Sequence, residues 1–139
     1  MPTEIEMRKP RVLVVDDDKL IRTMLQDGLT AAGYQVETAS NGAETFKAMP
    51  TFRPDVVVLD VIMPGENGYR VCRAIKELAS KGTSAVPRIV LLTSRRVDDD
   101  AEREEVLLGF SRADLMLYKP CDAPRMLEAL AKLLTPTSA

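Results

Sequence analysis

The sequence predicts an α/β fold, a doubly wound, five-stranded parallel sheet made of five βα units. Short β-branched and aliphatic runs alternate with longer stretches of helical period along the chain. Two of the apolar runs end in aspartate, as expected where parallel strands bring their carboxyl ends to one edge. With right-handed crossovers, the expected strand order is 2-1-3-4-5.

The first unit is a strand from Arg11 to Val15 and a helix from about Lys19 to Ala32. Gly33 provides the stop for this helix. Its apolar stripe consists of Leu20, Ile21, Met24, Leu25 and Leu29. Residues 1–10 before the strand are expected to be an N-terminal extension.

The second unit has a short strand near Gln35 to Ala39 and, after the Asn41-Gly42 turn, a short helix from Ala43 to Met49. We expect Pro50 and Pro54 to break the chain before the third strand. That third strand is expected over Asp55 to Leu59.

The third unit continues through a turn-rich loop, Met63 to Gly68, into a helix from about Tyr69 to Ser80. Val71, Cys72, Ile75 and Leu78 are expected to face inward. The fourth strand is expected from Arg88 to Leu92.

The fourth helix is expected to begin at the carboxylates of Asp98 to Asp100, which suit a helix start better than a second metal site, and to reach Phe110. The fifth unit is a strand from Leu115 to Tyr118 and an amphipathic helix from Ala123 to Leu134. Together, residues 11–134 form one domain, and 135–139 are expected to be a tail.

The composition excludes several classes of function. The chain has 139 residues, a net charge of −2 and no histidine, which removes imidazole-based nucleophile schemes and most zinc sites. The charge also gives no general attraction to nucleic acid or anionic membranes. No apolar run resembles a signal peptide or a membrane span, so we expect a cytoplasmic protein. Cys72 and Cys121 lack redox or metal-ligand spacing and are not expected to pair.

Polar side chains gather at the expected carboxyl edge of the sheet. Asp16 and Asp17 follow the first strand, Asp60 follows the third, Thr93 the fourth and Lys119 the fifth. Crowded carboxylates need a counter-charge, and Mg²⁺ prefers such oxygen ligands. With a metal and a lysine to neutralise charge, a carboxylate can act as a phosphoryl acceptor, so the set describes a device for phosphorylating Asp60. Asp18 is expected to cap the first helix instead.

These residues stand in motifs that resemble the receiver domains of two-component response regulators, in particular standalone receivers of the chemotaxis-regulator kind with a flavodoxin-like fold. The matching stretches, which span about Pro10 to Leu134, are Val14-Val15-Asp16-Asp17, Leu59-Asp60-Val61-Ile62-Met63-Pro64 with Gly68, Leu92-Thr93-Ser94 and Lys119-Pro120.

The resemblance implies roles for the site residues. Asp60 would be the phosphoacceptor, and Asp16, Asp17 and Asp60 would hold Mg²⁺ together with the backbone carbonyl of Ile62. Thr93 and Lys119 would stabilise the phosphoryl group, and the Lys119–Pro120 peptide bond is a candidate for the cis form.

The resemblance also implies partners. A sensor histidine kinase or a histidine phosphotransfer protein would phosphorylate the chain, which is not itself an enzyme. Output would go to a downstream protein, with no direct contact to nucleic acid or membrane, and a homodimer through the last helices fits the family.

The sequence departs from the family pattern around the last strand. Met116 stands three residues before Lys119, where receivers usually carry the aromatic switch residue. Arg112 replaces a frequent glycine, and Cys121 replaces a frequent phenylalanine. The usual aromatic coupling to Thr93 is therefore missing, and the output surface is expected to be unusual.

Two residues beside the site are expected to prolong the lifetime of the phosphoryl group. The apolar Ile62 and the long cationic Arg95 would both hinder an attacking water molecule, so slow autodephosphorylation is expected.

Two alternatives remain from the sequence alone. One is a receiver-like scaffold that binds proteins without being phosphorylated, which the atypical Met116 favours. The other is a small Mg²⁺-dependent phosphohydrolase, although that chemistry needs an acid or base two residues after the nucleophile, where Ile62 stands.

Overall fold

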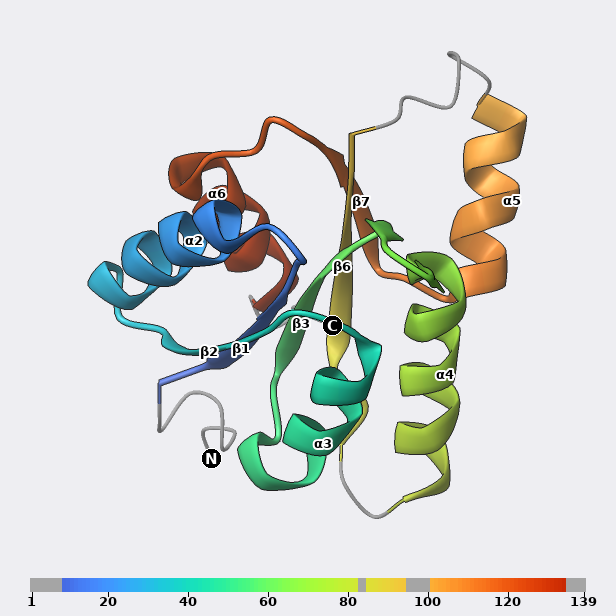
Figure 1. Ribbon diagram of the computed structural model, residues 1–139, viewed down its shortest axis with the longest axis horizontal. Coiled ribbons are helices and arrows are strands. Elements are labelled where there is room, and N and C mark those ends of the chain that lie inside the picture. Colours follow the sequence, from blue (N-terminus) through green and yellow to red (C-terminus); the bar gives the residue numbers. More distant parts are fainter. Residues whose placement is uncertain (1–8, 83–84, 95–100, 135–139) are drawn as a thin grey trace, which may run out of the picture.

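A computed structural model describes residues 9–82, 85–94 and 101–134, with residues 101–104 described by their backbone alone. It contains a five-stranded parallel sheet in the order β2-β1-β3-β6-β7, which confirms the predicted order (Figure 1). The strands of this sheet are β1 (Arg11–Val15), β2 (Gln35–Ala39), β3 (Val56–Asp60), β6 (Arg88–Thr93) and β7 (Leu115–Tyr118). The helices are α2 (Lys19–Ala31), α3 (Gly42–Phe52), α4 (Gly68–Lys81), α5 (Ala101–Ser111) and α6 (Ala123–Leu134).

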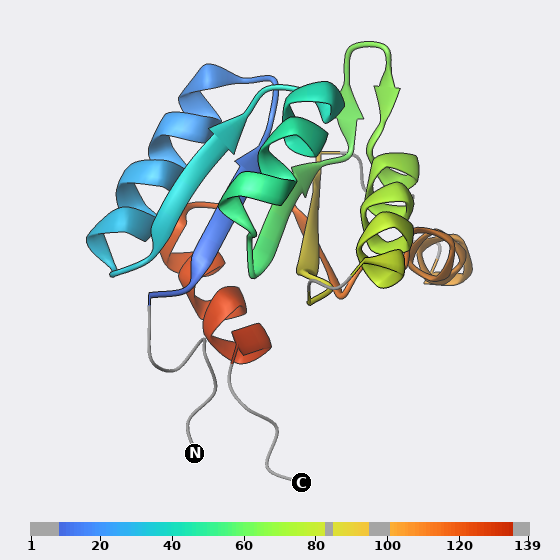
Figure 2. The ribbon, with the colours of Figure 1, turned by 90° about the horizontal axis from the view of Figure 1, so that it is seen from below.

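Helices cover both faces of the sheet (Figure 2). Leu13 and Val15 of β1 belong to a core that includes residues of α3, α4 and α5. Val12 and Val14 belong to a second core that includes residues of α2 and α6. Because alternate residues of a strand face opposite sides, a strand buried on both faces must be apolar throughout, as β1 is.

Helix α3 extends further than the sequence predicts. It includes Pro50, ends at Phe52 and has Arg53 in a left-handed conformation with φ of 52° at its C-cap. The predicted break at Pro50 was therefore wrong. Proline removes one backbone donor in the last turn, and the helix then closes through the Arg53 N–H, which donates to the Met49 carbonyl over 3.0 Å.

The predicted loop after β3 contains a small antiparallel hairpin. Strands β4 (Ile62–Met63) and β5 (Glu66–Asn67) pair, with Ile62 opposite Asn67 and Met63 opposite Glu66. Gly65 makes the turn possible through its φ of +72°. The acceptor strand therefore leads directly into an ordered ribbon.

Three apolar residues expected to pack are largely exposed. Leu20 and Met24 of α2 are 80% and 40% exposed, and Leu78 of α4, which was expected to face inward, is 60% exposed. Leu78 lines a cavity of about 570 Å³ between the ends of α3 and α4. Helical spacing alone places these residues beside the buried stripe but does not say where the neighbouring layer ends.

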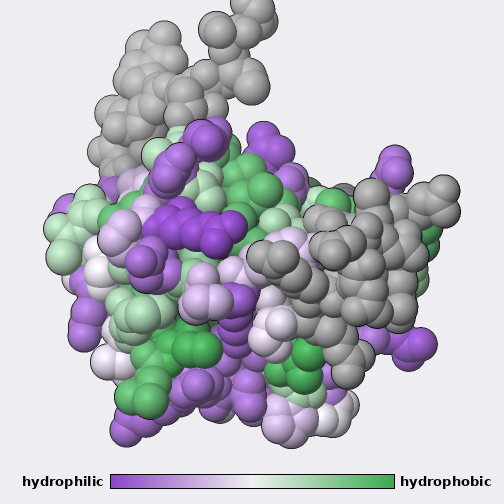
Figure 3. Space-filling model, turned by 90° about the horizontal axis from the view of Figure 1, so that it is seen from above, coloured by the Kyte–Doolittle hydropathy of each residue, from purple (hydrophilic) through white to green (hydrophobic). Residues whose placement is uncertain are grey.

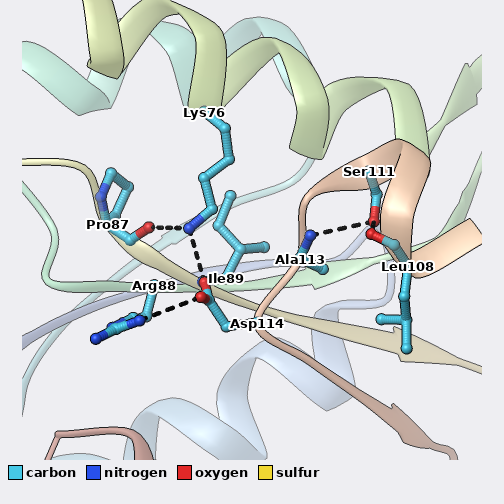
Figure 4. A network of polar contacts seen from close by, with 8 residues as sticks. All are labelled: Lys76, Pro87, Arg88, Ile89, Leu108, Ser111, Ala113 and Asp114. Carbon is cyan, nitrogen blue, oxygen red and sulfur yellow. Dashed lines mark hydrogen bonds and ion pairs between the residues drawn. The ribbon is translucent and has the colours of Figure 1, made fainter. Parts of the chain in front are cut away.

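A polar cluster fixes the amino end of the sheet (Figure 4). The Lys76 ammonium of α4 donates to the Pro87 carbonyl over 2.8 Å and to Asp114 Oδ2 over 2.7 Å. Asp114 Oδ2 also accepts from the Ile89 N–H, and the Asp114 N–H donates to the Ile89 carbonyl. The cluster thus ties α4 to the beginnings of β6 and β7.

The two cysteines are both buried and free, as expected. Cys72 lies in the core on the α4 side, and Cys121 lies in the core on the α6 side. Burial raises the pKa of the Cys72 thiol to about 12, so this thiol is neutral. None of the described helices is long and apolar enough to cross a membrane.

Candidate functional site

Three carboxylates meet at the carboxyl edge of the sheet. Asp16 follows β1 and Asp60 ends β3, and these strands are neighbours, with Val15 opposite Leu59. Ligand oxygens of Asp16, Asp17 and Asp60 all lie within 4.8 Å of one another. Asp16 and Asp60 are 1% and 3% exposed, whereas Asp17 is exposed. Figure 3 looks onto this edge and shows hydrophilic residues gathered across its middle.

The acidic turn after β1 divides its aspartates between two tasks. Asp18 caps α2, because its side chain accepts from the Leu20 N–H over 2.9 Å, which confirms its predicted role. Asp16 accepts from the Asp18 N–H through Oδ1 over 2.9 Å. The Arg22 guanidinium donates to the Asp16 carbonyl over 2.7 Å, a contact between side chain and backbone that no sequence motif indicates.

Lys119 joins two of the carboxylates. Its ammonium lies 2.9 Å from Asp16 Oδ2 and 3.3 Å from Asp60 Oδ1. Its backbone N–H donates to the Thr93 carbonyl over 2.8 Å, and the Lys119–Pro120 peptide bond is cis. Burial alone would lower the pKa of Lys119, but its contacts with Asp16 and Asp60 outweigh that effect and raise it.

The ionised form of Asp60 is disfavoured in the folded chain. Burial first, and then the neighbouring charge of Asp16, raise its pKa to about 6, although Lys119 and the N–H of Ile62 oppose the shift. The Ile62 N–H donates to Asp60 Oδ1 over 3.2 Å. The ionised carboxylate of Asp60 is therefore disfavoured in the metal-free site, and a bound cation would favour it.

The donor set fits Mg²⁺. Asp16, Asp17 and Asp60 supply carboxylate oxygens, and Ile62 follows two residues after Asp60 with a backbone carbonyl. Hard oxygen donors of this kind suit an ion that keeps several of its waters.

Gly68 allows the chain to pass closely over the acceptor. A Cβ at this position would lie 2.5 Å from Val61 Cα and 2.6 Å from the Asp60 carbonyl oxygen. The Gly68 N–H donates to the Val61 carbonyl over 2.8 Å. Only glycine fits here, because the three nearest atoms that a Cβ would meet all belong to the backbone.

Two of the remaining predicted residues lie in β6 and β7, and the others lie outside the described part. Thr93 ends β6, is 1% exposed and meets Lys119 through its backbone. Met116 is 8% exposed and lies in the core on the α3, α4 and α5 side, opposite Leu91 of β6. Arg95 and the Asp98 to Asp100 run lie outside the described residues.

Residues 12–131 match the model of the response regulator receiver domain. The chain belongs to this family. This is the family that the sequence motifs at the carboxyl edge of the sheet indicate.

Curated relatives are response regulators and transcriptional regulators. The transcriptional regulatory protein AfsQ1 of Streptomyces coelicolor is 40% identical over 121 residues, which cover 86% of this chain and 48% of AfsQ1. The response regulator MprA of a Mycobacterium species is 41% identical over 128 residues, which cover 92% of this chain and 52% of MprA. The receiver therefore spans about half the length of these relatives.

Solved structures share the fold. The chemotaxis protein CheY4 of Vibrio cholerae matches with a TM-score of 0.78 and 29% identity, covering 91% of this chain and 99% of CheY4. The response regulator TrrA of Thermotoga maritima, solved in complex with Mg²⁺ and BeF, matches with a TM-score of 0.72 and 32% identity, covering 90% of this chain and 99% of TrrA.

Proposed function

We propose that this receiver is a phosphorylation switch in which Asp60 accepts a phosphoryl group in an Mg²⁺-dependent step. The donor would be a phosphohistidine of a sensor kinase or a phosphotransfer protein. The observation that carries the proposal is the buried Asp60 carboxylate, held by Lys119 and flanked by Asp16 and Asp17 within 4.8 Å.

The two carboxylate oxygens of Asp60 would divide the metal contact and the transfer between them. In the metal-free chain the Lys119 ammonium and the Ile62 N–H both contact Oδ1. One carboxylate oxygen would bind Mg²⁺, and the other would form the new bond to phosphorus while the phosphorus–nitrogen bond of the phosphohistidine breaks. Bound Mg²⁺ would neutralise charge on the transferring group, and Lys119 would add a second fixed positive charge.

The switch would act on the ends of β6 and β7 together. A phosphoryl group adds roughly one to two negative charges, which would draw the Lys119 ammonium and the Thr93 hydroxyl toward Asp60. Since the Lys119 N–H is bonded to the Thr93 carbonyl, the two chain segments would move as one unit. Met116 has no ring or hydroxyl, so the core would respond by repacking a flexible side chain.

Output is proposed to pass through protein contacts on the last helices. On α5, Val106 is 68% exposed and Phe110 is 41% exposed, which leaves apolar surface for a partner or for a second copy of the chain. A net charge of −2 favours such contacts over direct binding to nucleic acid.

A beryllofluoride titration tests the proposal. In the presence of Mg²⁺, beryllofluoride should shift the backbone NMR resonances of the wild-type site and of the segments after β6 and β7, and Asp60→Asn should show no such shift. A wild-type protein that binds neither Mg²⁺ nor beryllofluoride would favour a receiver-like scaffold that works without phosphorylation.

A further inference from the structure

Glu66, which has no part in the proposed chemistry, links the acceptor hairpin to a distant helix. Both of its carboxylate oxygens accept from the Gly42 N–H, over 3.0 Å and 2.8 Å. Gly42 is the first residue of α3 and lies 24 positions earlier in the chain. Figure 2 shows the hairpin standing beside the start of that helix.

The residue at the start of α3 is suited to this contact. A Cβ at Gly42 would lie 2.5 Å from Glu66 Oε2, so a side chain there would displace the carboxylate. The N–H groups at a helix start carry partial positive charge, which favours a carboxylate. Glycine at the first position therefore opens the helix end to Glu66.

The helix does not need Glu66 for its own capping. The Asn41 side chain accepts from the Glu44 N–H over 2.8 Å, and the Glu44 carboxylate accepts from the Ser40 N–H over 2.8 Å. This reciprocal pair already caps α3 locally. The Glu66 contact adds a link from the helix to another part of the fold.

The hairpin carries that link to the acceptor site. Glu66 is paired with Met63, and the neighbouring pair joins Asn67 to Ile62. Asn67 in turn caps α4 by accepting from the Tyr69 N–H over 2.9 Å. With one strand of the hairpin held by two helix starts, the other strand, which contains Ile62, has little freedom to shift.

We propose that Glu66 is a positioning residue that holds the hairpin so that the Ile62 carbonyl is presented to the metal. This inference rests on the proposed Mg²⁺ site. Glu66 does not contact the ion in this account, and its effect passes through the backbone of the hairpin.

Mg²⁺ affinity, measured by NMR titration of the full chain, tests the proposal. Glu66→Ala should weaken Mg²⁺ binding by roughly three- to tenfold, at or below the lower end of the losses seen when an outer-shell partner of a metal site is removed. Glu66→Gln, which keeps one acceptor oxygen, should lie between Ala and wild type. Hydrogen exchange of the hairpin amides should speed up in the same order without Mg²⁺.

Asn41→Ala is the matched control. It removes a cap from the same helix and should reduce stability by a similar amount, yet the Asn41 side chain bonds to the Glu44 N–H of α3 and not to Glu66, so Mg²⁺ affinity should stay unchanged. The proposal is overturned if Glu66→Ala binds Mg²⁺ as tightly as wild type, or if Asn41→Ala weakens binding equally. A wild-type chain that does not bind Mg²⁺ would overturn the proposed function together with this inference.

Discussion

The ionisation of Asp60 is unfavourable in the folded, metal-free chain. Its pKa is raised well above the ordinary value of an aspartate, to about 6, chiefly by burial and by Asp16. A carboxyl group with a raised pKa destabilises the native state at pH values above the folded pKa. This penalty disappears as the pH falls below the unfolded value.

Asp60→Asn should therefore stabilise the metal-free protein at pH 7.5, by up to about 3 kcal/mol. The gain in stability should shrink between pH 6 and 4. In this range Asp60 becomes protonated in the native state and is then as neutral as the asparagine that replaces it. Urea unfolding of the two proteins across this range measures the difference. A difference that does not depend on pH would contradict the electrostatic account of the site.

The side chain of Ile62 is half-exposed at 49% and follows the acceptor by two residues. An apolar group beside the acceptor gives no hydrogen bond to an attacking water. Ile62→Asn should therefore speed the loss of phosphate from Asp60 by about tenfold, because the amide would position that water. The decay of phosphorylated protein after removal of the phosphodonor measures the rate. An unchanged lifetime would show that Ile62 does not limit access of water.

Residues that stand in a local motif could be placed from the sequence. Asp16, Asp17 and Asp60 end apolar runs, and parallel pairing of two strands brings them together as predicted. The contact between Glu66 and Gly42 could not be predicted, because it joins two turns whose separation depends on how α3 packs. The one local sign of this contact in the sequence is that Gly42 directly follows the N-cap residue Asn41.

Gly68 joins the acceptor strand β3 and the hairpin to α4. Gly68→Ala should destabilise the protein by about 1–3 kcal/mol, the usual cost of forcing an extra methyl group into a packed region. The same change should lower Mg²⁺ affinity, because the backbone of Asp60 and Val61 must shift. Gly109→Ala is the control: apart from the backbone of its own helix and its chain neighbours, no atom lies within 4 Å of a Cβ there, and the protein should gain up to about 1 kcal/mol in stability. Equal effects of the two substitutions would contradict the close approach at Gly68.

Arg112, the residue directly after α5, stands where the family frequently has glycine. Its φ is 63°, in the left-handed region that favours glycine, and its N–H donates to the Leu108 carbonyl over 2.9 Å. Arg112→Gly should stabilise the chain by about 1 kcal/mol, since the steric cost of a Cβ is removed there. Lys47→Gly, inside α3, should lose a similar amount. Thermal unfolding measures the stability of both variants. A destabilised Arg112→Gly variant would contradict a steric cost of the Arg112 Cβ in the left-handed region.

The strands were predictable because four of the five are short apolar runs, and all five begin and end within one residue of the predicted bounds. The hairpin was not predictable, because a strand of two residues is too short to show a hydrophobic period. Pro50 misled the prediction for a physical reason: proline is costly within a helix, but packing of Phe46 and Met49 against the core extends α3 past it.

The two ends of the sheet differ in how their charges are paired. The amino end is held by the cluster of Lys76 and Asp114, which links α4 to β6 and β7. The carboxyl end carries like charges that Lys119 only partly offsets. A charge added at Asp60 would therefore be felt most by the chain segments after β6 and β7, while the opposite end of the same strands stays fixed.

Asp60 is the proposed phosphoacceptor. Incubation with acetyl phosphate and Mg²⁺, followed by borohydride reduction and peptide mass spectrometry, tests this role, since reduction of an aspartyl phosphate leaves a stable mark at the modified residue. We expect one phosphoryl group per wild-type chain, the mark at Asp60, and no gain without Mg²⁺ or in Asp60→Asn. A mark at another residue, or no phosphorylation of the wild type under these conditions, would overturn the proposal.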